Sequence, residues 1–150
     1  MVVVVDELDL KIINLLIDNS KLSYRKLAAR LGVSVATIMN RINKLEKDKI
    51  IRKYTAIIDY EKLGYDMAII TEIRLTHGNR LDIGKKIAED SNVRSAVNTT
   101  GGVDLLVSAL FKSRQEMDGF LKKLHSIEAV ERTETKLILN TLKDENIKVG

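Results

Sequence analysis

Between Ser34 and Lys44, the sequence places side chains that could contact DNA on one face of an expected helix. Small and hydroxylated residues begin this segment, and their size permits close approach to a DNA groove. Asn40 and Arg41 follow, and each can form paired hydrogen bonds with the edge of a base. We expect the groove-facing residues to be Ser34, Ala36, Thr37, Asn40, Arg41 and Lys44.

Basic residues around this segment favour a polyanionic partner. Residues 20–55 contain ten Lys and Arg residues against Glu46 and Asp48, so this window carries +8, although the whole chain of 150 residues carries only +4. From Gly64 onward, thirteen basic residues balance thirteen acidic ones. Such concentrated charge suits nucleic acid or an anionic membrane surface. We expect contacts with phosphate groups from Arg25, Lys26, Lys44, Lys47, Lys49, Arg52 and Lys53.

Three short helices are expected to position these side chains. Helical spacing of apolar residues predicts the first helix at about residues 7–19, with acidic residues in its first turn. Ser23 is expected to cap a second helix that ends at Gly32, and Ser34 to cap the third. The inward stripe of the third helix would be Val35, Ile38, Ile42 and Leu45. The turn from Gly32 to Ser34 predicts a helix-turn-helix unit that binds double-stranded DNA.

The second half of the chain predicts a sheet with two helices. Residues 50–58 are β-branched and partly alternating, which predicts a strand or wing. The later elements are expected as a strand at 67–75, a helix at 79–90, strands at 93–100 and 105–111, a helix after the capping box at 113–116, and a strand at 130–142. This β-α-β-β-α-β order is that of ferredoxin-like domains. The expected organisation is an α+β protein with a DNA-binding domain at 1–59, a hinge at 60–65 and a second domain at 66–150.

The expected sheet would expose an apolar face. In the segment 105–111, Leu106 and Leu110 alternate with Val107 and Phe111, so both sides of the strand are apolar. Helices cover only one face of a ferredoxin-like sheet, and a large exposed apolar patch favours a partner. We therefore expect a homodimer through the sheets, whose two-fold axis would present two helix-turn-helix units to a pseudo-palindromic site.

Enzymatic and membrane functions find no support in the sequence. The absence of Cys excludes disulfides and cysteine-ligated metal sites. His77 and His125 fall in different expected elements, without the spaced partners of a metal site or an acid–base pair. The pair Gly101-Gly102 precedes a strand and lacks the phosphate-loop pattern. No run approaches the roughly 20 apolar residues that span a bilayer. We expect a cytoplasmic protein that is not an enzyme and has no metal or cofactor.

The chain resembles the Lrp/AsnC family of feast/famine transcription regulators from about Asp6 to Lys143. The resemblance is carried by the ordered spacing of Leu8, Asp9, Ile12, Ile13, Leu15, Leu16, Leu27, Ala28, Leu31, Gly32, Val33, Ser34, Arg41, Ile42, Leu45, Glu46, Ile50, Ile51, Thr55, Ala56, Thr100, Gly101, Asp104, Glu131, Arg132, Thr133 and Thr135. It implies a winged helix-turn-helix domain, a hinge strand and a C-terminal ferredoxin-like (RAM) domain. It further implies dimers that assemble into tetramers, octamers or larger rings and often bind an amino acid between subunits.

The resemblance also implies an amino-acid effector site around the turn at 99–104. The implied residues are Thr99, Thr100, Gly101, Asp104, Thr133 and Thr135. A carboxylate such as Asp104 can hold an α-ammonium group, and the free N–H groups of a glycine turn suit an α-carboxylate. This chain departs from the family, which commonly has an acidic residue in place of Gly102 and an aromatic one in place of Val103. Two alternatives stay open, namely a plain hairpin turn and an effector-free architectural DNA-binding protein.

Overall fold

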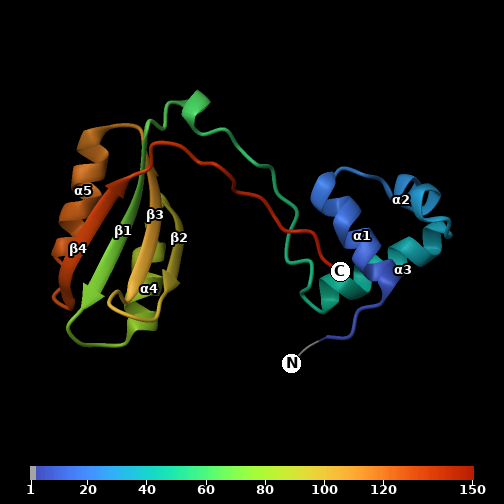
Figure 1. The fold of residues 1–150 in the computed structure, drawn as a ribbon, viewed down its shortest axis with the longest axis horizontal. Helices are drawn as coiled ribbons and strands as arrows, with labels where there is room; N and C mark the ends of the chain where they lie inside the picture. The colour runs from blue at the N-terminus through green and yellow to red at the C-terminus, as the bar shows by residue number, and fades with distance from the viewer. Residues whose placement is uncertain (1–2) are drawn as a thin grey trace. The chain divides into compact units, whose positions relative to one another are not determined.

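The computed structural model describes residues 3–150, which divide into two compact units (Figure 1). The first unit contains the chain up to Ile57 together with Lys143–Gly150, and the second contains Ile58–Leu142. The last residues therefore pack with the DNA-binding unit, whereas the sequence assigned them to the second domain. The physical reason is a set of hydrogen bonds to the first helix, described below.

The first unit is built from α1 (Glu7–Asp18), α2 (Tyr24–Leu31) and α3 (Val35–Lys47). Each helix begins at a side chain that accepts a backbone N–H group: Asp6 for α1, Ser23 for α2 and Ser34 for α3. Gly32 ends α2 with φ of +67°, a left-handed conformation that glycine adopts without strain. The predicted helices, caps and turn are thus confirmed.

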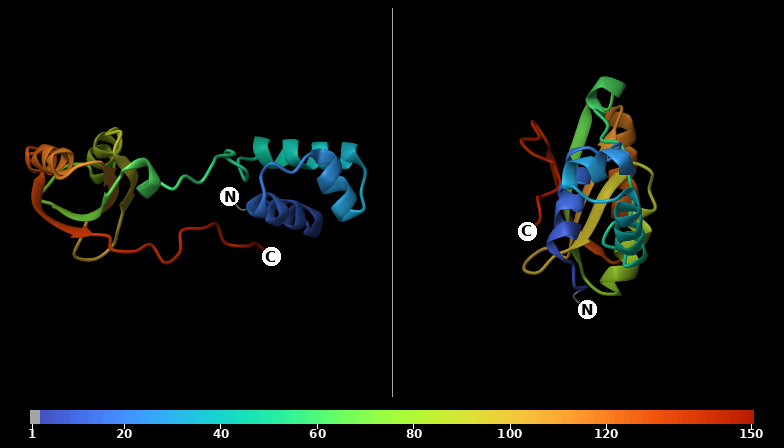
Figure 2. Two further views of the ribbon diagram at one scale, coloured as in Figure 1. Left: turned by 90° about the horizontal axis from the view of Figure 1, so that it is seen from above. Right: turned by 90° about the vertical axis from the view of Figure 1, so that its right-hand side faces the viewer.

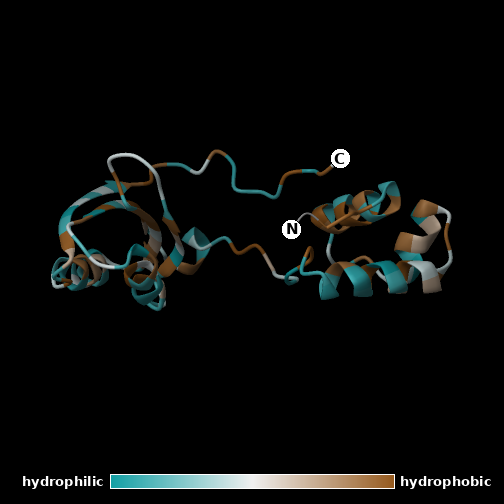
Figure 3. Cartoon of the chain, turned by 90° about the horizontal axis from the view of Figure 1, so that it is seen from below, coloured by the Kyte–Doolittle hydropathy of each residue, from teal (hydrophilic) through white to brown (hydrophobic). Residues whose placement is uncertain are grey.

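The core of this unit consists of side chains that all three helices turn inward. Figure 3 shows how hydrophobic and hydrophilic residues alternate along α3. Ile38, Ile42 and Leu45 are buried as predicted, but Val35 is 43% exposed. Its assignment to the inward stripe was wrong, because it lies in the first turn of α3, at the margin of the buried face. Ile12 and Leu27, both fully buried, complete the centre of the cluster.

The segment Ile50–Ile58 forms no β-strand in the chain as described. A strand needs a neighbouring strand for its N–H and C=O groups. Ile57 is 82% exposed and Tyr54 is 47% exposed, so most of this apolar segment is uncovered. The predicted strand or wing is therefore an extended segment.

The second unit is an antiparallel sheet in the order β2-β3-β1-β4 with both helices on one face (Figure 2). Its elements are β1 (Met67–Leu75), α4 (Arg80–Ala88), β2 (Val93–Asn98), β3 (Leu105–Phe111), α5 (Arg114–His125) and β4 (Val130–Leu137). This confirms the ferredoxin-like fold. The last strand ends at Leu137, which pairs with Ile69 of β1, and not at Leu142 as predicted.

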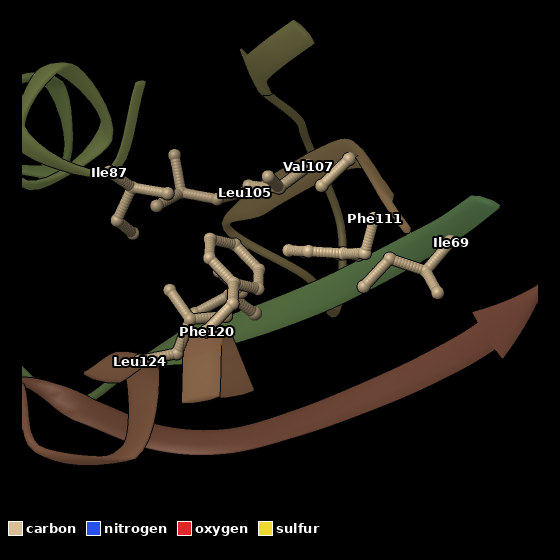
Figure 4. Close-up of a cluster of buried hydrophobic side chains, with 9 residues drawn as sticks. Ile69, Ile87, Leu105, Val107, Phe111, Phe120 and Leu124 are labelled. Atoms are coloured by element: carbon tan, nitrogen blue, oxygen red, sulfur yellow. The ribbon is translucent and has the colours of Figure 1, made fainter. Parts of the chain in front are cut away.

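The core of the second unit lies between the sheet and its two helices (Figure 4). Phe111 of β3 and Phe120 of α5 meet with ring centroids 5.3 Å apart. Gly84 lets α4 approach β3 closely, because a Cβ atom there would lie only 3.2 Å from Cδ2 of Leu105. The glycine that weakens α4 in isolation therefore allows a close approach between α4 and β3.

Candidate DNA interface and ligand-binding turn

The outer face of α3 presents the polar groups expected to contact DNA. Ala36, Asn40 and Lys44 are exposed, one helical turn apart from each other. Ser34 and Thr37 are engaged with one another: the Ser34 hydroxyl accepts the Thr37 N–H at 3.0 Å, and the two hydroxyl oxygens lie 2.8 Å apart. These hydroxyls therefore fix the beginning of α3, and the exposed amide of Asn40 is the free hydrogen-bonding group nearest the middle of the helix.

Three further exposed residues on α3 were missed by the sequence interpretation. Val35 and Met39 are each 43% exposed, and Asn43 is also exposed. Val35 and Met39 stand at positions i and i+4, so they form one apolar edge beside Ala36 and Asn40. A signal was available for Met39, because it is an apolar residue outside the predicted stripe of a basic helix.

Arg41 does not lie on this outer face. Its Nη1 atom donates to the Asp6 carboxylate and lies 3.3 Å from Oδ1 of Asp9, at the beginning of α1. The Asp9 side chain is only 3% exposed. Arg41 therefore links α3 to α1 through Nη1, a role that the sequence interpretation did not give it.

The Asp6 carboxylate belongs to the same arrangement. It accepts the Asp9 N–H while Asp9 accepts the Asp6 N–H, both at 3.0 Å, which is a reciprocal capping box. The backbone N–H of Asp9, and next the hydrogen bond from Arg41, lower the pKa of Asp6 below its ordinary value of 3.8. The charged form of this carboxylate is therefore stabilised in the folded protein.

Basic residues flank α3 on α2 and on the segment after α3. Arg25 and Lys26 lie exposed in the first turn of α2, and Arg52 and Lys53 are exposed beyond α3. The Tyr54 hydroxyl donates to the Glu46 carboxylate at 2.9 Å and so ties that segment to the end of α3. Burial, followed by this hydrogen bond, raises the pKa of Tyr54 above its ordinary value of 10.0. The tyrosine therefore stays protonated as a donor.

The turn between β2 and β3 is closed by its own hydrogen bonds. The Thr99 N–H donates to the Asp104 carbonyl at 3.1 Å, and the Thr99 hydroxyl donates to the Val103 carbonyl at 2.7 Å. Gly101 has φ of +97°, which favours glycine. Thr100, Gly101 and Gly102 are exposed at the tip. The tip of the turn is therefore exposed, whereas the two ends of the turn are held together by the hydrogen bonds of Thr99.

Asp104 is buried and has partners within its own chain. It is 7% exposed, it accepts the Leu75 N–H at 2.7 Å, and Nε of Arg80 lies 3.0 Å from its other carboxylate oxygen. Its N–H donates to the Ile73 carbonyl at 3.0 Å. These contacts make Asp104 the residue that holds the turn against β1 and α4, which differs from the expected direct contact with an α-ammonium group.

Thr133 and Thr135 lie on β4, away from this turn. Thr135 pairs with the buried Thr71, and their hydroxyl oxygens lie 3.1 Å apart. The Thr133 hydroxyl lies 2.7 Å from Nε2 of His125 on α5. Both threonines therefore face the helix-covered side of the sheet, and the single chain does not bring them together with Gly101 into one site.

Residues 3–150 contain no group of three or more His, Cys, Asp or Glu side chains placed to hold a metal ion. Among the same residues, no helix is long and apolar enough to cross a membrane.

Both units match models of known domain families. Residues 5–52 match the winged helix-turn-helix DNA-binding domain, and residues 68–147 match the Lrp/AsnC ligand binding domain. An uncharacterized HTH-type transcriptional regulator of Pyrococcus furiosus is 41% identical over 141 residues, which cover 94% of this chain and 95% of the relative. The HTH-type transcriptional regulator FL11 of Pyrococcus horikoshii is 35% identical and covers 96% of this chain and 95% of its own.

Solved structures agree with this result. AsnC from E. coli has a TM-score of 0.87 at 26% identity, over 98% of this chain and 100% of its own. A transcriptional regulator from Neisseria meningitidis, solved as a complex with L-Met, has a TM-score of 0.89 at 23% identity, over 98% and 97% of the two chains. A helix-turn-helix unit joined to a ferredoxin-like ligand-binding domain defines a class of DNA-binding transcriptional regulators. The chain belongs to the Lrp/AsnC family of these regulators, as its sequence pattern predicted.

Proposed function

We propose that α3 enters the major groove of its operator and reads bases with the face that carries Ala36 and Asn40. The observation that supports this most directly is the exposed amide of Asn40 on a helix whose beginning is fixed by Ser34. An Asn side chain can accept from and donate to adenine in a bidentate pair. Arg25, Lys26, Lys44, Arg52 and Lys53 hold the unit on the DNA by contacts with phosphates.

Val35 and Met39 add an apolar contribution to this face. The major groove presents one apolar group, the methyl group of thymine. Two half-exposed aliphatic side chains beside Asn40 fit contact with such methyl groups. This favours operators in which thymine stands close to the adenine read by Asn40.

The DNA proposal is tested by comparing Asn40→Ala with Lys53→Ala on duplexes selected from a random library. Loss of a base contact costs about 1 to 3 kcal/mol at one base position and relaxes selectivity there, whereas loss of a phosphate contact weakens all duplexes and lowers the salt slope by about one. The exposed Lys85 on α4 gives the matched control Lys85→Ala, which removes the same charge outside the DNA-binding unit. Equal effects of Asn40→Ala on every sequence would overturn the proposed base contact.

We infer that two chains associate through the helix-free face of the sheet. This face carries Ala68, Ile70, Val97, Leu106 and Leu110, which the strand register places on the same side. Val97 is 49% exposed, and the other four are half-buried in the single chain. Apolar residues of this kind, which share the face with the Glu72–Lys136 ion pair, are stabilised by a partner surface, and a two-fold pair would present two α3 helices to successive major grooves.

We further propose that an amino acid binds at the β2–β3 turn, between subunits. The family of the ligand-binding domain and the outward backbone of Thr100, Gly101 and Gly102 support this site. Free N–H groups at a glycine turn suit a carboxylate. Asp104 acts by holding the turn in shape and does not contact the ligand. A bound amino acid would change assembly, and through it the occupancy of the operator.

Calorimetric titration of the full chain with each of the twenty amino acids, L-methionine included, tests the effector. Binding of one of them, lost in Gly102→Val but kept in Ser126→Ala at the C-cap of α5, supports the site. If no amino acid gives heat while operator binding is intact, the effector proposal is wrong and an effector-free DNA-binding protein is the better description.

A further inference from the structure

The last residues of the chain lie along α1 of the DNA-binding unit. The side-chain amide of Asn14 binds the backbone of Val149 twice: Nδ2 donates to the Val149 carbonyl at 2.8 Å, and Oδ1 accepts the Val149 N–H at 2.9 Å. An amide that satisfies both the donor and the acceptor of one residue imitates the pairing between two strands. Such a contact recognises an extended backbone independently of its side chain.

Neighbouring residues extend the contact along the same helix face. Nζ of Lys148 donates to the main-chain carbonyl of Asn14 at 2.9 Å and forms an ion pair with Asp18. A Cβ atom at Gly150 would lie 3.5 Å from Cδ1 of Leu10, so this residue lies against the Leu10 side chain. Leu10, Asn14 and Asp18 follow each other at intervals of four residues and therefore form one stripe on α1.

We propose that this stripe of α1 is a docking site for an extended peptide segment, and that residues 148–150 of the chain are its ligand. The occupant is defined by the structure itself, since the contact lies within one compact unit. The charges agree, because Lys148 meets an acidic residue beside the C-terminal end of α1. We call residues 143–150 the strap.

Docking of the strap gives the ligand-binding domain a second, non-covalent attachment to the DNA-binding unit. The first connection is the segment that leaves α3 and leads through the turn Glu61–Leu63 into β1. The second leaves β4 at Leu137 and ends on α1. A unit held at two points has fewer orientations than one held at a single point. The docked strap therefore limits the half-site spacings that a dimer accepts, a consequence that rests on the dimeric DNA binding proposed above.

Docking is tested directly by amide hydrogen exchange of the full chain in solution. Val149→Pro removes the N–H group that Asn14 accepts, without a change to α1, while Val149→Ala keeps the backbone pair and serves as its control. Asn14→Ala removes the same pair from the other side. Loss of these hydrogen bonds should accelerate exchange of the strap amides by roughly tenfold in Val149→Pro and Asn14→Ala but not in Val149→Ala. Full exchange of the strap in the wild type, or equal behaviour of the two Val149 variants, would refute docking.

The functional consequence is measured on two kinds of DNA. Affinity for a duplex with a single half-site should be the same in all four proteins, since the α3 surface is untouched. The second set of duplexes carries two half-sites at varied spacing, and the measured quantity is the ratio of affinities between the best and the worst spacing. This ratio should be at least about fivefold smaller in Val149→Pro and Asn14→Ala than in the wild type and Val149→Ala. Unchanged discrimination would overturn the tethering role. Absence of DNA binding by the wild type would overturn the proposed function and leave the exchange result standing.

Discussion

The guanidinium of Arg41 lies 3.3 Å from the buried carboxylate of Asp9 and joins the centre of α3 to the beginning of α1. This contact spans 32 residues of sequence and acts where the outer face of α3 must be held for groove entry. Because Asp9 is 3% exposed, its charge has little access to water and needs this partner. The pair therefore decides how α3 is presented, although neither residue belongs to the exposed face.

Replacing Arg41 with Ala is expected to lower the free energy of unfolding, because the Asp9 carboxylate, which is 3% exposed, loses its charged partner. Affinity should fall for all duplexes alike. Denaturant unfolding and binding to a panel of single-base operator variants measure both effects. The exposed Asn43 provides the control, since Asn43→Ala should leave stability unchanged. A loss of selectivity at one base with full stability would instead restore a base-reading role for Arg41.

Acid should weaken the DNA-binding unit through Asp6. The pKa of this carboxyl group is lowered on folding, chiefly by the Asp9 N–H and then by Arg41, so its contribution to stability is complete above the unfolded value of 3.8 and is lost as the pH falls through the lower folded value. Unfolding measured from about pH 6 to about pH 2.5 should show a smaller acid dependence in Asp6→Asn, which still caps α1. An identical pH profile in wild type and variant would contradict this assignment.

Contact with thymine methyl groups can be tested by removing one methyl group at a time from the operator. Replacing thymine by uracil at each position of a selected operator should lower wild-type affinity about fourfold at one or two positions, the value of one buried methyl group. In Met39→Ala this difference should disappear at the position that Met39 contacts. The neighbouring Asn43→Ala should retain it. Equal binding of all uracil duplexes by the wild type would show that the apolar edge of α3 reads no thymine.

Asp104 is expected to act on the turn and not on the ligand. Asp104→Ala leaves the Leu75 N–H without its acceptor and should lower the free energy of unfolding by about 2 kcal/mol, with loss of ligand binding. Asp104→Asn can still accept that N–H and should retain most of both properties. Parallel calorimetry and thermal unfolding separate the two effects. An Asn variant of full stability that binds no amino acid would show direct contact between the carboxylate and an ammonium group.

A charge introduced on the helix-free face of the sheet tests whether two chains associate through this face. Leu106→Lys would place an ammonium group between the two sheets, where its cross-strand neighbour Glu72 is already paired with Lys136, and should raise the dimer dissociation constant by about 100-fold or more. Sedimentation equilibrium should then find a particle of 16.9 kDa, the mass of one chain. Leu81, 58% exposed on α4, supplies the control Leu81→Lys, which should keep the wild-type mass. Unchanged association of Leu106→Lys would place the interface elsewhere.

Local features of this protein were predictable because each depends on a few adjacent residues. Ser23 and Ser34 cap their helices, Gly32 takes the left-handed conformation, and the alternation in 67–75 gives β1. The capping box expected from Ser113 and Glu116 formed only in part, since the Glu116 carboxylate accepts the N–H of Lys112. The periodicity of apolar residues predicted where the helices lie. It predicted the burial of residues in their outermost turns less well, as the exposed Val35 shows.

Contacts between distant charges could not be predicted. Arg41 and Asp104 were both assigned to ligands by their chemistry, and both have partners in other elements of the same chain. A charged residue on a helix or turn looks the same in the sequence whether it contacts a ligand or pairs with another residue of its own chain. Only the fold decides which group it contacts. The same holds for Asn14, whose partner lies 135 residues away.

Gly84 also makes the stability of α4 depend on the sheet. Glycine in a helix interior costs about 1 kcal/mol relative to alanine, and an isolated helix shorter than about 12 residues is marginal in water. With nine residues and this glycine, α4 has little stability before Leu105 of β3 lies against it. The stability of α4 therefore depends on its contact with the strand that follows it in the chain, and not on the helix alone.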